Sequence, residues 1–203
     1  MNPITNHVSA NEADFVIENG VLKEYRGNET NVTIPDGVKV IEAWAFDGCS
    51  SLTSVTIPDS VTVIEAWAFD GCSRLTSVTI PEGVTEIGDG AFEYCSSLTS
   101  VTIPEGVKAI RDGTFAYSRL KSVAIPDSVT KIGQGAFYNC SSLKSVTIPD
   151  SVTAIGLWAF RGCSSLTSVT IPEKFKDNFK YCVPKEATMH YTSETISQEQ
   201  RLY

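Results

Sequence analysis

The stretch LTSVTIP at Leu52–Pro58 decides the fold, because the chain repeats it. Identical or nearly identical copies stand at Leu75–Pro81, Leu98–Pro104, Leu120–Pro126 (LKSVAIP), Leu143–Pro149 (LKSVTIP) and Leu166–Pro172. Division of the chain after each Ile-Pro yields six consecutive units: 36–58, 59–81, 82–104, 105–126, 127–149 and 150–172. The fourth unit has 22 residues and the other five have 23. A fixed period in this range is typical of a solenoid, in which each unit forms one coil of a stack.

The apolar positions recur in every unit, and the second unit, DSVTVIEAWAFDGCSRLTSVTIP, illustrates them. Val78 and Ile80 alternate with Thr79, which predicts a strand with one buried face that ends at Pro81. VTVI predicts a second short extended segment, and AWAFDGCS predicts a tight turn or a single helical turn. Because one unit cannot bury its apolar face alone, we expect a β-rich stack with a parallel sheet, roughly 30 Å long at about 4.8 Å per coil.

Two further residue types fall on the repeat phase. One phenylalanine per unit predicts an internal aromatic column: Phe46, Phe69, Phe92, Phe115, Phe137 and Phe160. Five of the six cysteines also share one phase: Cys49, Cys72, Cys95, Cys140 and Cys163. Stacked coils hold such side chains nearly parallel and about 4.8 Å apart, whereas a disulfide needs Cβ atoms roughly 3.8 Å apart. We therefore expect a column of buried free thiols.

Composition excludes several classes of partner. The 203 residues carry a net charge of −8, whereas nucleic-acid binding requires clustered Lys and Arg. No apolar run approaches the roughly 20 residues that span a bilayer, and the amino-terminal residues show no signal peptide. The sequence thus predicts no nucleic-acid partner and no membrane insertion, and it leaves the location open.

Catalytic chemistry has little support in the sequence. The two histidines, His7 and His190, lie near opposite ends of the chain, so a pair with a nucleophile would need distant segments to meet. No CxxC pair and no phosphate-binding glycine loop is present. We expect a protein that is not an enzyme and has no cofactor and no metal site.

The pattern IPxxVxxIGxxAFxxCxxLxxVxIP, which covers residues 36–172, resembles the BspA-like (Treponema-type) leucine-rich repeat family. The resemblance implies a curved, right-handed leucine-rich repeat array with the LxxVxI strands on its concave side. It also implies a cell-surface or secreted protein associated with adhesion. Residues 14–35 look like the amino-terminal cap that precedes such arrays.

These observations predict four parts of the chain. Residues 1–13 form a flexible leader, 14–35 a cap, 36–172 the six repeats, and 173–203 a carboxyl-terminal cap and tail. Phe175, Phe179 and Cys182 have helical spacing, so we expect a short capping helix over 173–182. Residues 187–191 (ATMHY) predict a last edge strand.

Strand alternation places a row of hydroxyl side chains on the outer face of the predicted concave sheet. The candidate partner-binding residues of this row are Ser54, Thr56, Ser77, Thr79, Ser100, Thr102, Ser145, Thr147, Ser168 and Thr170. The fourth unit interrupts the row with Ala124. This row is either a solvated sheet face or a flat, uncharged binding floor, on which small hydroxyls offer donors and acceptors at low ordering cost.

Three tryptophans, Trp44, Trp67 and Trp158, share one phase at which the other units have glycine. They either pack over the adjacent coil or form exposed aromatic anchors for a partner. An acidic residue follows each unit's proline, beginning with Asp36 and Asp59. Turn chemistry explains this column, and attraction of a hard cation such as Ca²⁺ is the alternative.

The sequence therefore predicts a monomeric, adhesin-like binding module for a protein or glycan ligand. One alternative is a structural spacer domain within a larger surface protein. A more remote alternative is an ice-binding protein, since repeated Ser-x-Thr pairs form a regular hydroxyl lattice, although Ala124 interrupts it.

Overall fold

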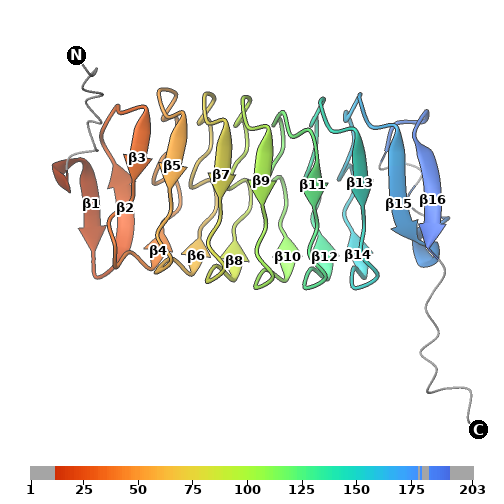
Figure 1. The fold of residues 1–203 in the computed structure, drawn as a ribbon, viewed down its shortest axis with the longest axis horizontal. Helices are drawn as coiled ribbons and strands as arrows, with labels where there is room; N and C mark the ends of the chain where they lie inside the picture. Colours follow the sequence, from red (N-terminus) through yellow and green to blue (C-terminus); the bar gives the residue numbers. More distant parts are fainter. Residues whose placement is uncertain (1–11, 178, 180–182, 193–203) are drawn as a thin grey trace, which may run out of the picture.

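The computed structural model describes residues 12–177, 179 and 183–192 as a single row of stacked coils (Figure 1). Two rows of parallel strands run along the stack. The first row contains β3 (Asn31–Thr33), β5 (Ser54–Thr56), β7 (Ser77–Thr79), β9 (Ser100–Thr102), β11 (Val123–Ala124), β13 (Ser145–Thr147) and β15 (Ser168–Pro172). The second row contains β4 (Val40–Ile41), β6 (Val63–Ile64), β8 (Glu86–Ile87), β10 (Ala109–Ile110), β12 (Lys131–Ile132) and β14 (Ala154–Ile155).

The strands pair in the register that the repeat dictates. In β7 and β9, Ser77 lies beside Ser100, Val78 beside Val101 and Thr79 beside Thr102. The valine of each triplet points into the core, where Val78 is 4% exposed, and the flanking Ser and Thr point outward. Both extended segments expected from the sequence are present, and the β-solenoid of about 23-residue coils is confirmed.

The segment between the two strands of each coil is a turn and not a helix. Its backbone bonds to the next coil: Trp67 N–H donates to Asp89 O at 2.8 Å, and Phe69 N–H donates to Ala91 O at 2.9 Å. The same pattern recurs from coil to coil, so this turn forms a third hydrogen-bonded side of the solenoid. The bonds satisfy backbone groups that would otherwise be orphaned beside the core.

The phenylalanine column is the centre of the core. All six rings are fully buried, and consecutive centroids lie 4.8, 5.2, 5.7, 5.6 and 5.1 Å apart with ring planes within 17° of parallel. Leu, Val and Ile of each coil surround them in one continuous cluster. The aromatic column predicted from the repeat phase is confirmed.

The cysteines of the repeat phase are free thiols, as expected. Cys72 Sγ donates to Phe46 O of the preceding coil at 3.3 Å, and Cys95 Sγ donates to Phe69 O at 3.2 Å. Burial raises the pKa of the Cys72 and Cys95 thiols far above the ordinary value. Burial, followed by the Asp47 charge, raises the pKa of half-buried Cys49 to about 11. These thiols therefore fill space and bond the coils together.

We expect the buried thiols to be inert in the native protein, because a reagent cannot reach them. At Cys72, Cys95 and Cys163 a raised pKa also suppresses the reactive thiolate at pH 8. In a Cys182→Ser variant, Ellman's reagent should detect less than one fast-reacting thiol under native conditions and all five remaining cysteines in guanidinium chloride. Rapid titration of two or more native thiols would contradict the buried column.

Both strand rows are interrupted between the third unit and the short fourth unit. The first row divides into β3-β5-β7-β9 and β11-β13-β15-β16, and the second divides between β8 and β10. Ser118 occupies the cysteine position of this unit and lies 3.2 Å from Cys140 Sγ. The turn side continues without a break, because Phe92 N–H still donates to Thr114 O at 2.9 Å. Both strand rows thus break between the same two coils while the turn side stays continuous.

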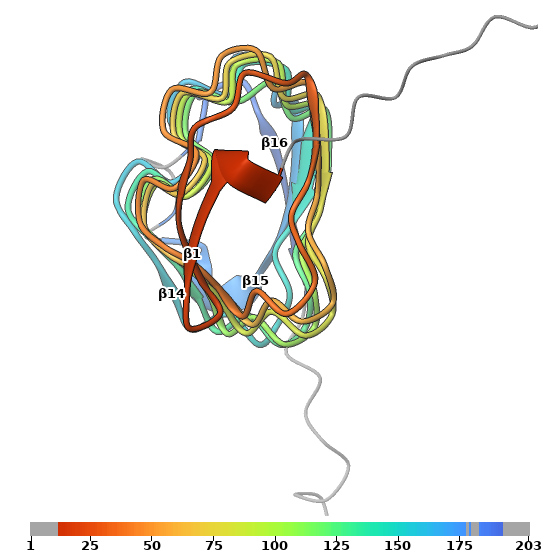
Figure 2. The same cartoon turned by 90° about the vertical axis from the view of Figure 1, so that its left-hand side faces the viewer.

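The amino-terminal end of the core lies beneath an antiparallel hairpin. Strands β1 (Phe15–Glu18) and β2 (Val21–Tyr25) follow the 3-10 turn η1 (Glu12–Asp14). Figure 2, which looks along the stack, shows β1 and this turn lying across the end of the coils. The Tyr25 ring stacks on Phe46 at 5.1 Å and packs at a tilt of 44° against Phe15 at 5.1 Å, so the hairpin extends the aromatic column.

At the other end, β16 (Thr188–Thr192) pairs in parallel with β15 and matches the expected edge strand to within one residue. The helix expected over 173–182 is wrong in its described part, which contains only the 3-10 turn η2 (Glu173–Phe175). Pro172 fixes the entry to this turn, and Phe179 packs edge-on against Phe160 at 6.0 Å. Cys182, His7, most of the leader and the tail after Thr192 lie outside the described residues. No helix in the described part of the chain is long and apolar enough to cross a membrane.

Candidate binding surfaces

The hydroxyl face consists of the outward Ser and Thr side chains of β5, β7, β9, β13 and β15. Thr56, Ser77, Thr79, Ser100, Thr102, Ser145 and Thr147 are exposed, and Ser54, Ser168 and Thr170 are half-buried. Ser54 Oγ donates to Asn31 Oδ1 at 2.6 Å. The break between β9 and β11 divides the face into two parts. The structure thus brings these residues together as two uncharged lattices with the spacing of the coils.

The first threonine of LTSVTIP belongs to the scaffold and not to this face. Thr76 Oγ1 donates to Thr53 O at 3.2 Å, and Thr99 Oγ1 donates to Thr76 O at 3.2 Å. Each such hydroxyl bonds to the backbone of the preceding coil and so reinforces the stack. The face available to a partner is therefore the Ser and the second Thr of each copy.

The tryptophans pack on adjacent coils and are also partly exposed, and their role as anchors for a partner stays a prediction. Trp44 and Trp67 stack with centroids 4.8 Å apart and planes 11° from parallel. Trp67 covers Gly90 of the next coil, where an added Cβ would lie 2.4 Å from the indole, and its N–H donates to the Glu93 carboxylate. Trp44 and Trp158 nevertheless remain 49% and 46% exposed. Trp158 lies apart from the other two, beneath the Arg161 guanidinium at 5.7 Å.

All three tryptophans have left-handed backbone, with φ of 65°, 54° and 61°. Such a conformation costs a bulky residue roughly 1–2 kcal/mol, and glycine adopts it freely. Gly90, Gly113 and Gly135 occupy the same position in the other units with φ near 60°. Strain of this kind gathers at functional sites, so these tryptophans are candidates on physical grounds.

A second left-handed position, four residues later, was not among the sites predicted from the sequence. Tyr94 and Tyr117 stand there with φ of 53° and 60°, and Gly48, Gly71 and Gly162 stand there in other units. Units with tryptophan at the first position have glycine at the second, and the Tyr94 and Tyr117 units have the reverse. This exchange is visible in the sequence as WAFDG against GAFEY, and a comparison of both positions would have found the tyrosines.

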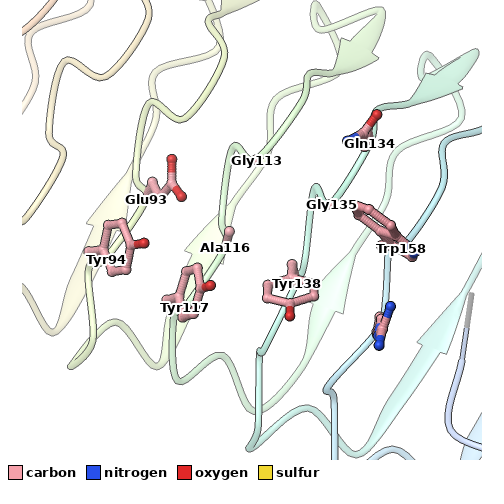
Figure 3. A pocket seen from close by; sticks show the side chains of 10 residues that line it. Glu93, Tyr94, Gly113, Ala116, Tyr117, Gln134, Gly135, Tyr138 and Trp158 are labelled. Carbon is pink, nitrogen blue, oxygen red and sulfur yellow. The ribbon is translucent and has the colours of Figure 1, made fainter.

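The exchange creates a trough on the turn side of the third to sixth units (Figure 3). It encloses about 370 Å³. Gly113, Gly135 and Ala116 line its base, and Tyr94, Tyr117 and Tyr138 follow one another along it on successive coils. Tyr94 and Tyr117 stack at 4.5 Å, whereas Tyr138 meets Tyr117 edge-on at 5.4 Å.

The two ends of the trough differ in charge. Glu93 lies at the Tyr94 end, and Trp158 forms the other end. The Arg161 guanidinium lies over the Trp158 ring and also lines the trough. Burial raises the pKa of the Glu93 carboxyl, the nearby Asp70 charge raises it further, and the Trp67 N–H partly offsets both. Along the turn, one position changes from acidic residues in the first three units to Arg161 in the sixth. The trough thus offers aromatic rings, hydroxyls and opposite charges at its two ends.

The acidic column after each proline is exposed along its length. Among the described residues, no group of three His, Cys, Asp or Glu side chains comes close enough together to hold a metal ion. Asp150 instead accepts a hydrogen bond at its Oδ1 from Thr192 at 3.2 Å. The described part of this column serves as turn structure.

Comparison with known proteins agrees with this architecture. The family model described as BspA type leucine rich repeat region (6 copies) matches residues 17–141 and 108–199. The leucine rich repeat protein of T. pallidum is 30% identical over 92% of this chain and 83% of its own, with a TM-score of 0.59. A leucine rich cell surface protein of Faecalibacterium prausnitzii A2-165 is 30% identical over 84% of this chain and 61% of its own, with a TM-score of 0.39. A search of curated proteins finds no match. The chain therefore belongs to the BspA-type leucine-rich repeat family.

Proposed function

We propose that this chain is a non-enzymatic, adhesin-like module that binds a protein or glycan through the hydroxyl face and the adjoining turns. The observation that carries the proposal is the preformed exposure of the hydroxyl face on in-register parallel strands. Little ordering entropy is lost when a partner binds a surface that is already rigid. The hydrogen-bonded stack makes such a surface extended as well as rigid.

A cell-surface location is part of the same proposal. The F. prausnitzii relative, which is 30% identical, is described as a cell surface protein. An uncharged face of small hydroxyls suits the polar surfaces of host proteins and glycans, because each hydroxyl both donates and accepts hydrogen bonds. Family membership and the face itself support the proposal together.

The test is a double substitution, Thr79→Lys with Thr102→Lys, in the centre of the face. Both side chains are exposed, so the fold should persist, while two charges should reduce retention of glycoproteins or arrayed glycans at least tenfold. The matched control is Thr62→Lys with Thr85→Lys, which adds the same charge beside the second strand row. Equal binding by both double variants and the parent would show that the hydroxyl face is not the site.

A further inference from the structure

The aromatic residues of the trough are not required by the solenoid. Tyr94 and Tyr117 occupy left-handed positions at which Gly48, Gly71 and Gly162 serve the same turn, and Trp158 occupies one at which three units have glycine. Glycine adopts this backbone without strain, whereas a bulky residue there is an outlier. Strained side chains that remain exposed at a cavity indicate a function outside the fold.

The orientation of the rings restricts the ligand. Tyr94 and Tyr117 stack face to face at 4.5 Å with planes 14° apart, so each ring covers one face of the other and their hydroxyls are hydrogen-bonded together. A sugar ring needs an open aromatic face for stacking. A polyproline II segment instead packs its rings between aromatic ridges and offers carbonyls to hydroxyl and indole donors.

The spacing of the coils fits the same conformation. A polyproline II helix advances about 9.3 Å per three-residue turn. Two coils advance about 9.6 Å at the usual strand spacing. Prolines at positions i and i+3 would therefore lie about two coils apart along the trough, which crosses four coils from Tyr94 to Trp158. The row in Figure 3 runs in this direction.

Charge defines the ends of the occupant. The Glu93 carboxylate lies over the base of the trough, 3.6 Å from where a Cβ on Gly113 would stand. Its ionised form would pair with a basic side chain that flanks the prolines. Trp158 at the far end supplies an indole surface 46% open to solvent.

We infer that the trough between Glu93 and Trp158 is a binding site for a proline-rich peptide in the polyproline II conformation with an adjacent Arg or Lys. This site rests on the proposed binding role of the chain but not on the hydroxyl face. The expected partner of this surface, which differs between units because Trp and Tyr occupy two different turn positions, is therefore a proline-rich peptide.

The test uses the full chain and a synthetic peptide with one arginine followed by eight prolines, acetylated and amidated, in isothermal titration. The decisive variant is Gly113→Trp. Tryptophan at this turn position is already present in three units, and Trp67 lies over the following glycine, so a tryptophan at 113 should lie over Gly135 and fill the trough. Binding should weaken at least tenfold.

Three further variants keep the inference falsifiable if Gly113→Trp folds poorly. One variant combines Tyr94→Gly with Tyr117→Gly, and a second carries Trp158→Gly alone. Both should shift Tm by only a few degrees, because other units have glycine at those positions. Each should weaken the peptide at least fivefold. Glu93→Gln should weaken it several-fold at low salt and less at 0.5 M salt, because screening removes the ionic part.

Controls separate this site from the hydroxyl face. Peptide binding should be unchanged in two control variants. The first is Ala124→Thr, which restores the residue that other units have, and the second combines Thr79→Lys with Thr102→Lys. An arginine followed by four Gly-Ser pairs should not bind. The inference would be overturned if the parent did not bind the peptide at 1 mM, or if Gly113→Trp bound it as tightly as the parent. It would also be overturned if the parent bound a chito- or cello-oligosaccharide in preference to the peptide and Gly113→Trp abolished that binding.

Discussion

Replacement of Phe92 by alanine should lower the free energy of unfolding by about 3–5 kcal/mol. The ring is fully buried, 5.2 Å from Phe69 and 5.7 Å from Phe115, so its removal leaves a cavity between two coils that share the ring's contacts. Domains of this size are stable by only about 5–15 kcal/mol, so the loss is a large part of the total. Urea unfolding followed by circular dichroism measures it.

The matched control for this substitution is Phe92→Leu, which keeps most of the volume and should lose less than the alanine variant. A loss below about 1 kcal/mol for Phe92→Ala would mean that neighbouring coils collapse into the space. The column would then be plastic and not the centre of the core.

Deletion of residues 14–35 should convert the soluble chain into aggregates. The deletion removes Leu22, which is fully buried, and Tyr25, which stacks on Phe46. It also removes β2 and β3, which pair with β4 and β5, so two strand edges and the end of the aromatic column become exposed together. Exposed edges beside an apolar surface pair with other chains.

Size-exclusion chromatography with light scattering reports this outcome. The control is Tyr25→Ala in the intact chain, which weakens the same contact but leaves β2 and β3 in place, and it should remain soluble with reduced stability. A soluble monomer after the deletion would show that residues 14–35 are dispensable as a cap.

The repeated parts of the fold were predictable because each physical requirement recurs. Val78 and its equivalents alternate with outward Ser and Thr, which specifies strand and face together, and the constant phase of the phenylalanines specifies the column. The break in both strand rows was predictable only as a local change at the short fourth unit. Its position depends on how the backbones of two neighbouring coils pair, which the sequence of one unit does not specify.

The binding surfaces were predictable in unequal degree. The hydroxyl face follows from strand alternation within one unit. The trough depends on residues from four units, and its walls come from three different turn positions. Tyr94 and Tyr117 stand in a left-handed conformation that their side chains disfavour, so local propensity gives no indication of it. Gly113 and Gly135 contribute to the trough because they have no side chain that would fill it.

The two left-handed positions of each turn make the exterior interchangeable without any change to the interior. Neither position contributes to the phenylalanine column or to the strand rows. The first position holds glycine or tryptophan, and the second holds glycine, tyrosine or, in the fifth unit, Asn139. Duplication of a unit with glycine first and tyrosine second would lengthen the trough by one coil, about 4.8 Å. Duplication of a unit with tryptophan first would close it. The number and order of such units therefore set the length of the peptide that this solenoid could accommodate.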